Sequence, residues 1–151
     1  MSSIIELKGN LFDYLNKDDI FLHSCNGQGT WGAGIAKGFA KNFPKSYISH
    51  KERHNKVGDG YVLKDDGYNV GCIITSEFYG TRKAPPKEIL VFTFISLIKL
   101  FSSFESDSFT IQSPKINSGL FKVPWDLSAK IIERAISKCP EKDITWVTRE
   151  L

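Results

Sequence analysis

Four glycines lie within the twelve residues from His23 to Gly34, between a short apolar run and an amphipathic run. The apolar run, Ile20-Phe21-Leu22, is typical of a strand, and the residues after Gly34 repeat apolar side chains at helical spacing. A glycine-rich loop that leads into a helix N-terminus gathers several backbone N–H groups at one point, where the helix dipole adds partial positive charge. Such a loop binds phosphate, so we expect a ligand that carries phosphate, and a diphosphate in particular.

Three side chains of this segment carry groups that can act on a ligand. His23 stands where the strand is expected to end, and its imidazole can transfer protons near neutral pH. Asn26 offers both a donor and an acceptor to ribose hydroxyls, and Trp31 can cover a ligand or pack in the core. The alternative for His23 is a histidine at the core edge that bonds only to backbone. We predict that His23 and Asn26 are the catalytic residues.

A second loop, from Ser113 to Pro124, has the same arrangement, because it leaves a strand and enters a helix. The carboxyl ends of neighbouring parallel strands share one edge of an α/β sheet, and such proteins bind their ligands there. We therefore expect the two loops to hold one diphosphate from both sides.

Other motifs for phosphate, thiol or metal chemistry are incomplete. Gly27-x-Gly29-x-x-Gly32 spells the dinucleotide fingerprint, but residues 47–56, where a second strand with an acidic end belongs, are polar and helical in character. No Gly-Lys-Ser/Thr occurs, and no cysteine precedes an arginine at the spacing of a thiol phosphatase. His50 and His54 lack the H-E-x-x-H order and a third ligand. We expect no metal and no cofactor.

Composition limits the class of protein and of partner. The chain has 151 residues, 41% of them apolar and 25% charged, with a net charge of +3 and no stripe of Lys and Arg. This composition suits an anionic small molecule better than a nucleic acid.

Three cysteines cannot all pair with each other, and the N-terminus has no signal-peptide pattern, so we expect reduced thiols and a location in the cytosol, the nucleus or both. The most apolar run, 89–101, falls short of the ~20 residues that span a bilayer. We expect one monomeric domain over residues 1–151, without membrane contact.

Strand-like and helix-like runs alternate along the chain. Strands are expected at 4–7, 20–23, 60–63, 70–75, 109–112 and 144–148, and helices at 34–43, 46–53, 86–102 and 125–138. This alternation predicts an α/β protein with helices on both faces of the sheet.

Several of these motifs together resemble the macrodomain family, and the resemblance spans nearly the whole chain. They comprise Lys8-Gly9-Asn10, His23-Ser24-Cys25-Asn26, and the segments 31–36, 116–125 and 144–147. The second motif and the Ile-Asn-Ser-Gly that begins at Ile116 are similar to a fungal branch that acts on ADP-ribose 1''-phosphate, a by-product of tRNA splicing. The resemblance implies a three-layer α/β/α fold around a mixed sheet. It also implies metal-independent hydrolysis of the terminal phosphate to ADP-ribose and phosphate.

The resemblance also implies where the ligand lies. Asn10 would sit by the adenine, residues 32–35 would wrap the diphosphate, Asn26 would meet the distal ribose, and His23 would stand near the terminal phosphate. The ligand-binding residues implied in this way are Gly9, Asn10, Leu11, Ser24, Cys25, Trp31, Gly32, Ala33, Gly34, Ile35, Ala36, Asn117, Ser118, Gly119, Leu120, Phe121, Lys122 and Val123.

The chain departs from the family pattern at a few positions. His23 replaces an asparagine of the broader family, and Lys122 stands where the phosphatase branch usually has glycine, so its side chain would crowd the diphosphate or pair with it. Ser76 and Phe121 occupy the places of the lysine and aspartate of the protein glycohydrolase branch. Two alternatives to the phosphatase remain: a module that binds ADP-ribose, free or on modified proteins, without turnover, and a hydrolase of ADP-ribosyl or O-acetyl-ADP-ribose esters.

Overall fold

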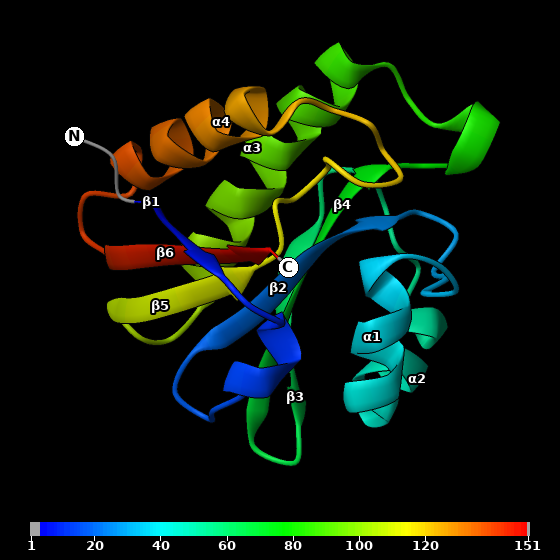
Figure 1. Cartoon of the computed structure of the whole chain (residues 1–151). Coiled ribbons are helices and arrows are strands. Elements are labelled where there is room, and N and C mark those ends of the chain that lie inside the picture. The colour runs from blue at the N-terminus through cyan, green and yellow to red at the C-terminus, as the bar shows by residue number, and fades with distance from the viewer. Residues whose placement is uncertain (1–3, 151) are drawn as a thin grey trace.

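The computed structural model describes residues 4–150, and in this range the chain forms a six-stranded mixed sheet. The strands lie in the order β1-β6-β5-β2-β4-β3, and every neighbouring pair is parallel except β4 and β3 (Figure 1). Their bounds are β1 Ile4–Lys8, β2 Ile20–Asn26, β3 Gly60–Asp65, β4 Tyr68–Ser76, β5 Ser108–Ser113 and β6 Asp143–Glu150. The antiparallel pair is a hairpin closed by Asp66 and Gly67, both with positive φ.

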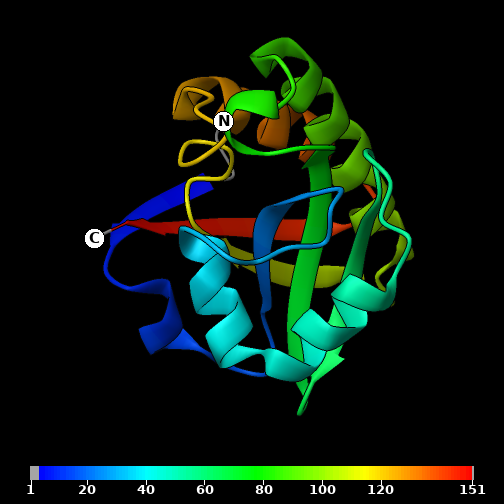
Figure 2. The ribbon, with the colours of Figure 1, turned by 90° about the vertical axis from the view of Figure 1, so that its right-hand side faces the viewer.

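Helices cover both faces of the sheet, which makes three layers (Figures 1 and 2). The helices are α1 Ile35–Asn42, α2 Pro44–Glu52, α3 Pro86–Ser103 and α4 Trp125–Ser137, with short 3-10 helices at Leu11–Tyr14 and Gly80–Arg82. Alternate residues of β2 explain the two cores, because successive side chains point to opposite faces. Ile20 and Leu22 pack in the core under α3 and α4, and Phe21 and Cys25 pack in the core that includes Phe39 of α1.

The predicted α/β/α class is confirmed, and most predicted elements lie within two residues of the observed ones. The strand predicted at 20–23 is the main difference, since β2 continues to Asn26. The helix predicted at 46–53 begins earlier, because Pro44 is the first residue of α2, and the missing N–H of a proline costs nothing in a first turn. The two short 3-10 helices have no counterpart in the prediction.

The connections of β2 and β5 create a crevice at the carboxyl edge of the sheet. These two strands are neighbours, but their pairing is limited to Ile20 with Ile111 and Phe21 with Gln112. The chain leaves β2 for α1 on one face and leaves β5 for α4 on the opposite face. A crevice opens where adjacent strands connect to opposite faces, and α/β proteins bind ligands in this crevice.

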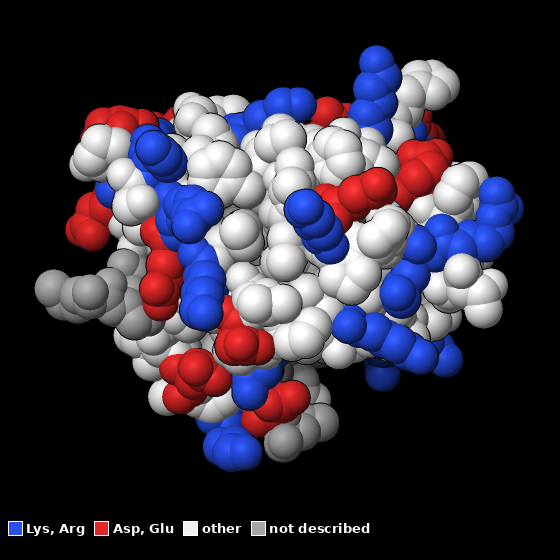
Figure 3. Space-filling model, turned by 90° about the horizontal axis from the view of Figure 1, so that it is seen from above, with Lys and Arg blue, Asp and Glu red and all other residues white. Residues whose placement is uncertain are grey.

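No helix within residues 4–150 is both long and apolar enough to cross a membrane. On the face over α3 and α4, Lys and Arg alternate with Asp and Glu around uncharged surface (Figure 3). This mixed pattern is not a basic stripe, and the expectation that nucleic acid is no direct partner stays a prediction.

Candidate functional site

A cavity of about 810 Å³ lies at the crevice between β2 and β5. Its wall consists of the residues that follow β1, the end of β2, the loop from β2 into α1, the loop from β5 into α4, and the end of β6. Tyr47 of α2 and Tyr79 complete it. The two glycine-containing loops predicted to face each other therefore share one cavity. Figure 2 shows the loop after β5 close to the start of α1.

Asn26 shapes the first loop through its side-chain amide. Its Oδ1 accepts a hydrogen bond from the N–H of Gln28 at 2.9 Å, and its Nδ2 donates to the carbonyl and the hydroxyl of Thr30 at 3.1 and 3.2 Å. Gly27 turns back onto β4, because its N–H donates to the carbonyl of Ser76 at 2.8 Å. The loop is therefore held at its base before it enters the cavity.

The end of the first loop carries the amides that can bind an anion. The N–H of Trp31 donates to the Tyr47 hydroxyl at 3.2 Å. Within residues 4–150, the N–H groups of residues 32–36 donate no hydrogen bond, as expected for a loop that enters the first turn of α1. Gly34 has φ 60° and ψ −145°, a conformation that side chains rarely adopt, and it turns the chain into the helix. Free donors at a helix N-terminus bind phosphate.

Asn117 anchors the second loop through a buried hydrogen-bond network. Its Oδ1 accepts from the Thr75 hydroxyl of β4 at 3.2 Å, and its Nδ2 donates to the hydroxyls of Thr93 in α3 and Ser128 in α4 at 3.0 and 3.4 Å. Its backbone N–H donates to Ser24 Oγ of β2 at 3.3 Å. One asparagine thus ties the second loop to two strands and two helices.

The second loop also presents free amides. In the described part of the chain no hydrogen bond is donated by the N–H of Gly119, Leu120 or Phe121. The two loops meet at Gly34, where an added Cβ would lie 3.3 Å from Cδ1 of Leu120. Free backbone donors from both loops therefore border one cavity, which is the arrangement that a diphosphate requires.

The far end of the cavity is bordered by β1 and β6. Asn10 Oδ1 accepts from the Phe12 N–H at 3.0 Å, and the Arg149 guanidinium carbon lies 3.6 Å from the centroid of the Tyr14 ring. Lys115 Nζ lies 2.9 Å from a Glu150 carboxylate oxygen, and this hydrogen bond raises the pKa of Lys115. This end combines the apolar side chain of Leu11 with the polar groups of Asn10 and Arg149, as suits a nucleobase.

The structure brings most of the predicted ligand-binding residues to the cavity wall. They are Gly9, Asn10, Leu11, Ser24, Cys25, Asn26, Trp31, Gly32, Ala33, Gly34, Ile35, Ala36, Asn117, Ser118, Gly119, Leu120 and Phe121. Whether each contacts a ligand stays a prediction.

His23 is not among the residues that line the cavity, so its ring does not face the cavity, and its catalytic role stays a prediction. The side chain is fully buried, stacks on Phe39 with centroids 4.0 Å apart, and meets the edge of Trp31 at 4.6 Å. Burial lowers the pKa of His23, which keeps the ring neutral at pH 7. The physical reason is the length of β2, since the strand ends three residues later, at Asn26.

Two residues of the second loop also lie off the cavity wall. Val123 is buried with Ile89 and Phe121 in a small apolar cluster. Lys122 is exposed, has φ 56° and does not line the cavity, and whether its side chain crowds or pairs with a diphosphate stays a prediction. The left-handed backbone explains why glycine suits this position.

Sequence reasoning did not assign several wall residues to the site. They are Thr30, Tyr47, Pro114, Lys115, Ile116, Arg149 and Glu150. Arg149 and Glu150 end β6, and the parallel pairing of β6 with β5 and β1 is the signal that could have placed them at this edge. Tyr47 has no such signal, because it reaches the loop from a separate helix.

Comparison with known proteins agrees with this fold. The family model of the Macro domain matches residues 22–132. An ADP-ribose 1''-phosphate phosphatase of Meyerozyma guilliermondii is 30% identical over 165 residues, which cover 89% of this chain and 94% of that protein. A protein of the same name from Candida albicans is 34% identical over 137 residues, covering 80% of this chain and 85% of that protein. The chain belongs to the macrodomain family.

Solved structures of macrodomains share the fold at low sequence identity. The macrodomain of Mycobacterium tuberculosis DarG superimposes with a TM-score of 0.77 at 16% identity and covers 99% of this chain and 100% of that one. A Trypanosoma brucei macrodomain in complex with ADP-ribose has a TM-score of 0.71 at 13% identity, over 97% of this chain and 63% of that one. The mixed sheet and its layers are therefore those of the family.

Proposed function

We propose that this protein hydrolyses the terminal phosphate of ADP-ribose 1''-phosphate, releasing ADP-ribose and inorganic phosphate. One observation carries the proposal: free backbone N–H groups from two loops border a single cavity large enough for a nucleotide sugar. The relatives with the same name support it, because they match over most of both chains.

The residues along the cavity favour one orientation of a bound ADP-ribose molecule. Asn10, Leu11 and Arg149 offer a polar and apolar surface to the adenine, and the free amides of both loops bind the diphosphate between them. Ser24 and Asn26 then lie on the side of the distal ribose. The complex of the Trypanosoma brucei macrodomain with ADP-ribose supports this ligand class.

The chemistry that this geometry favours is positioning and charge stabilisation. A water oxygen attacks the terminal phosphorus, the bond from phosphorus to the ribose oxygen breaks, and that oxygen leaves with a proton as the sugar hydroxyl. Loop amides aimed at the phosphoryl oxygens stabilise the charge that develops there. Holding the diphosphate and both riboses rigidly keeps the phosphorus in reach of the attacking water. No step is assigned to His23, because its ring lies off the cavity wall.

The test is release of phosphate from ADP-ribose 1''-phosphate by the purified protein, with chelator in the assay. We expect multiple turnovers, and no release from ADP-ribose itself. Leu120→Glu should lower kcat/KM, because a carboxylate beside the diphosphate repels it, and Ile48→Glu on α2 is the matched control, since both side chains are about half exposed. Absence of turnover would overturn the proposal.

A second function, a module that binds ADP-ribose without turnover, is favoured by one observation. Glu150 is the one carboxylate on the cavity wall of the described residues, and it is paired with Lys115. The wall is thus rich in binding groups and poor in proton-transfer groups. Calorimetry that finds tight ADP-ribose binding in a protein without phosphatase, esterase or O-acetyl-ADP-ribose hydrolase activity would establish this function instead.

A further inference from the structure

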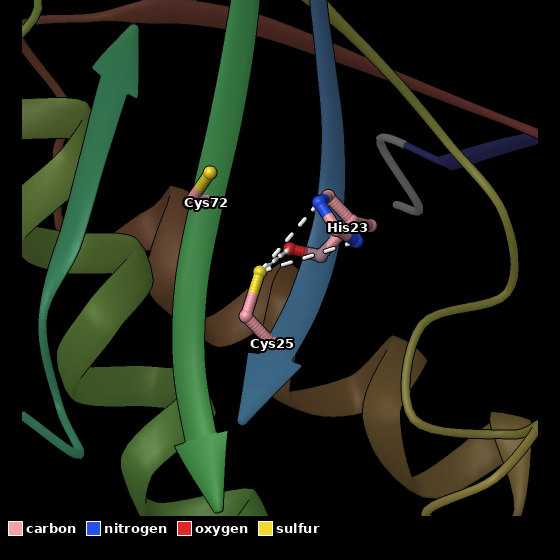
Figure 4. A group of neighbouring side chains, drawn as sticks. All are labelled: His23, Cys25 and Cys72. Carbon is pink, nitrogen blue, oxygen red and sulfur yellow. Dashed lines mark hydrogen bonds between the residues drawn. The ribbon is translucent and has the colours of Figure 1, made fainter. Parts of the chain in front are cut away.

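A group of two thiols and an imidazole lies beneath the first loop, on the face of the sheet that α1 and α2 cover. His23 and Cys25 come from β2, and Cys72 comes from the neighbouring β4 (Figure 4). All three side chains are buried, and one ligand atom from each lies within 4.8 Å of the others. His23 and Cys72 do not line the cavity, whereas Cys25 does, so the cluster lies beneath the cavity wall and borders the proposed phosphate site at Cys25.

The spacing of these atoms suits a tetrahedral metal ion. In a zinc site with Zn–S near ~2.3 Å and Zn–N near ~2.0 Å, tetrahedral angles leave sulfur and nitrogen about 3.6 Å apart. The distance from Cys25 Sγ to His23 Nε2 is 3.6 Å. That distance matches two ligands of one ion, and it is also within the range of a weak hydrogen bond that involves sulfur.

A disulfide between Cys25 and Cys72 fits the same atoms poorly. In the parallel pairing of β2 with β4, Cys72 lies opposite His23, and Cys25 lies opposite Ile74, so the two cysteines are offset by two residues. Strand spacing and rise then place their Cα atoms about 8 Å apart. Disulfides usually join Cα atoms up to about 6.8 Å apart, so a bridging ion fits better than a covalent bond.

A second histidine stands next to this group. His50 is fully buried on α2, its Nδ1 is 2.7 Å from the Tyr61 hydroxyl, and its Nε2 has no hydrogen-bond partner. His50 lies near enough to interact with both His23 and Cys72.

We propose that Cys25, Cys72 and His23 bind one Zn²⁺ ion, with His50 Nε2 as the fourth ligand. Two thiolates and two neutral imidazoles balance the charge of the ion, as a buried site requires. The Tyr61 hydroxyl then orients His50 through its other ring nitrogen. The ion joins β2 to β4 and α2 directly below Asn26, so its role is to hold the base of the first loop.

The test is the metal content of the full chain expressed in medium supplemented with zinc or, separately, with cobalt. Because the ligands are buried, the metal must enter during folding, and expression is the route that allows this. We expect about one zinc per chain by mass spectrometry. The cobalt-grown protein should show the strong visible absorption and the thiolate-to-cobalt charge-transfer band of a tetrahedral thiolate site.

Variants identify the ligands. Cys72→Ala and Cys25→Ala should lower the zinc content at least tenfold, and Cys139→Ala, which removes the other buried thiol, should leave it near one per chain. The cobalt spectrum of the unmodified chain tests the site even if a variant fails to fold. Less than about a tenth of a zinc per chain, copper in place of zinc, or equal zinc in Cys72→Ala and Cys139→Ala would overturn the proposal.

Discussion

Replacing Asn117 by alanine should loosen the second loop and destabilise the whole domain. The change removes side-chain hydrogen bonds to Thr75, Thr93 and Ser128, all in the buried interior. At about 1 kcal/mol net for each bond, with the hydroxyls of Thr75 and Ser128 left unpaired, the loss is about 2–4 kcal/mol. Asn117 also has φ 65°, where alanine costs about 1 kcal/mol more. The expected total is about 3–5 kcal/mol, a large part of the stability of an ordinary domain.

Urea unfolding and calorimetry with ADP-ribose measure the two consequences. We expect the free energy of unfolding of Asn117→Ala to fall by the amount above, and the affinity to fall at least tenfold under conditions where the variant is still folded. Asn117→Gly separates the loss of the side-chain hydrogen bonds from the backbone strain, because glycine adopts a positive φ without strain. This variant should be about 1 kcal/mol less destabilised than Asn117→Ala. Asn42→Ala, at an exposed position of α1, is the control and should change stability by less than about 0.5 kcal/mol. An unchanged urea midpoint with unchanged affinity would refute the anchoring role of Asn117.

Three further substitutions test the loops and the buried histidine. Leu120→Glu should weaken ADP-ribose binding by about 1–2 kcal/mol, or roughly five- to thirtyfold, in calorimetry, and an effect equal to that of Ile48→Glu would contradict the placement of the diphosphate. Gly34→Ala should cost about 1–3 kcal/mol in urea unfolding, because its φ is positive and the new Cβ would press on Leu120. Gly32→Ala, whose Cβ would meet nothing within 4 Å, is its control, and equal costs would argue against strain at Gly34. His23→Asn should lower the free energy of unfolding in urea by about 1–3 kcal/mol, because the smaller side chain leaves a cavity between Phe39 and Trp31. A hundredfold loss of kcat with stability unchanged would instead place the ring at the substrate.

The sequence predicts the site region well where local chemistry decides the structure. Glycines before an amphipathic run predict a loop that enters a helix, and the same pattern after the fifth strand predicts the second loop. Both loops lie at the cavity because parallel strands bring their carboxyl ends to one edge. The layers follow from alternation along β2, whose successive side chains enter different cores.

The sequence does not predict the position of a side chain where contacts between residues distant in the chain determine it. The end of β2 depends on its pairing with β4 through Asn26, and this pairing puts His23 two residues too deep in the sheet to reach the cavity. The network of Asn117 joins residues from β4, α3 and α4, and no local pattern shows that these hydroxyls converge. The same is true of Cys72, which meets Cys25 only because their strands are neighbours.

The most direct test of two amide loops around one diphosphate is a titration of ¹⁵N-labelled protein with ADP-ribose, followed by amide chemical shifts. We predict that the amide protons of Gly32 to Gly34 and of Gly119 to Phe121 move downfield together, with one saturating curve, because each gains a hydrogen bond to a phosphate oxygen. Inorganic phosphate alone should move the same signals less. Shifts confined to other parts of the chain, or no shift with ADP-ribose at millimolar concentration, would contradict this account.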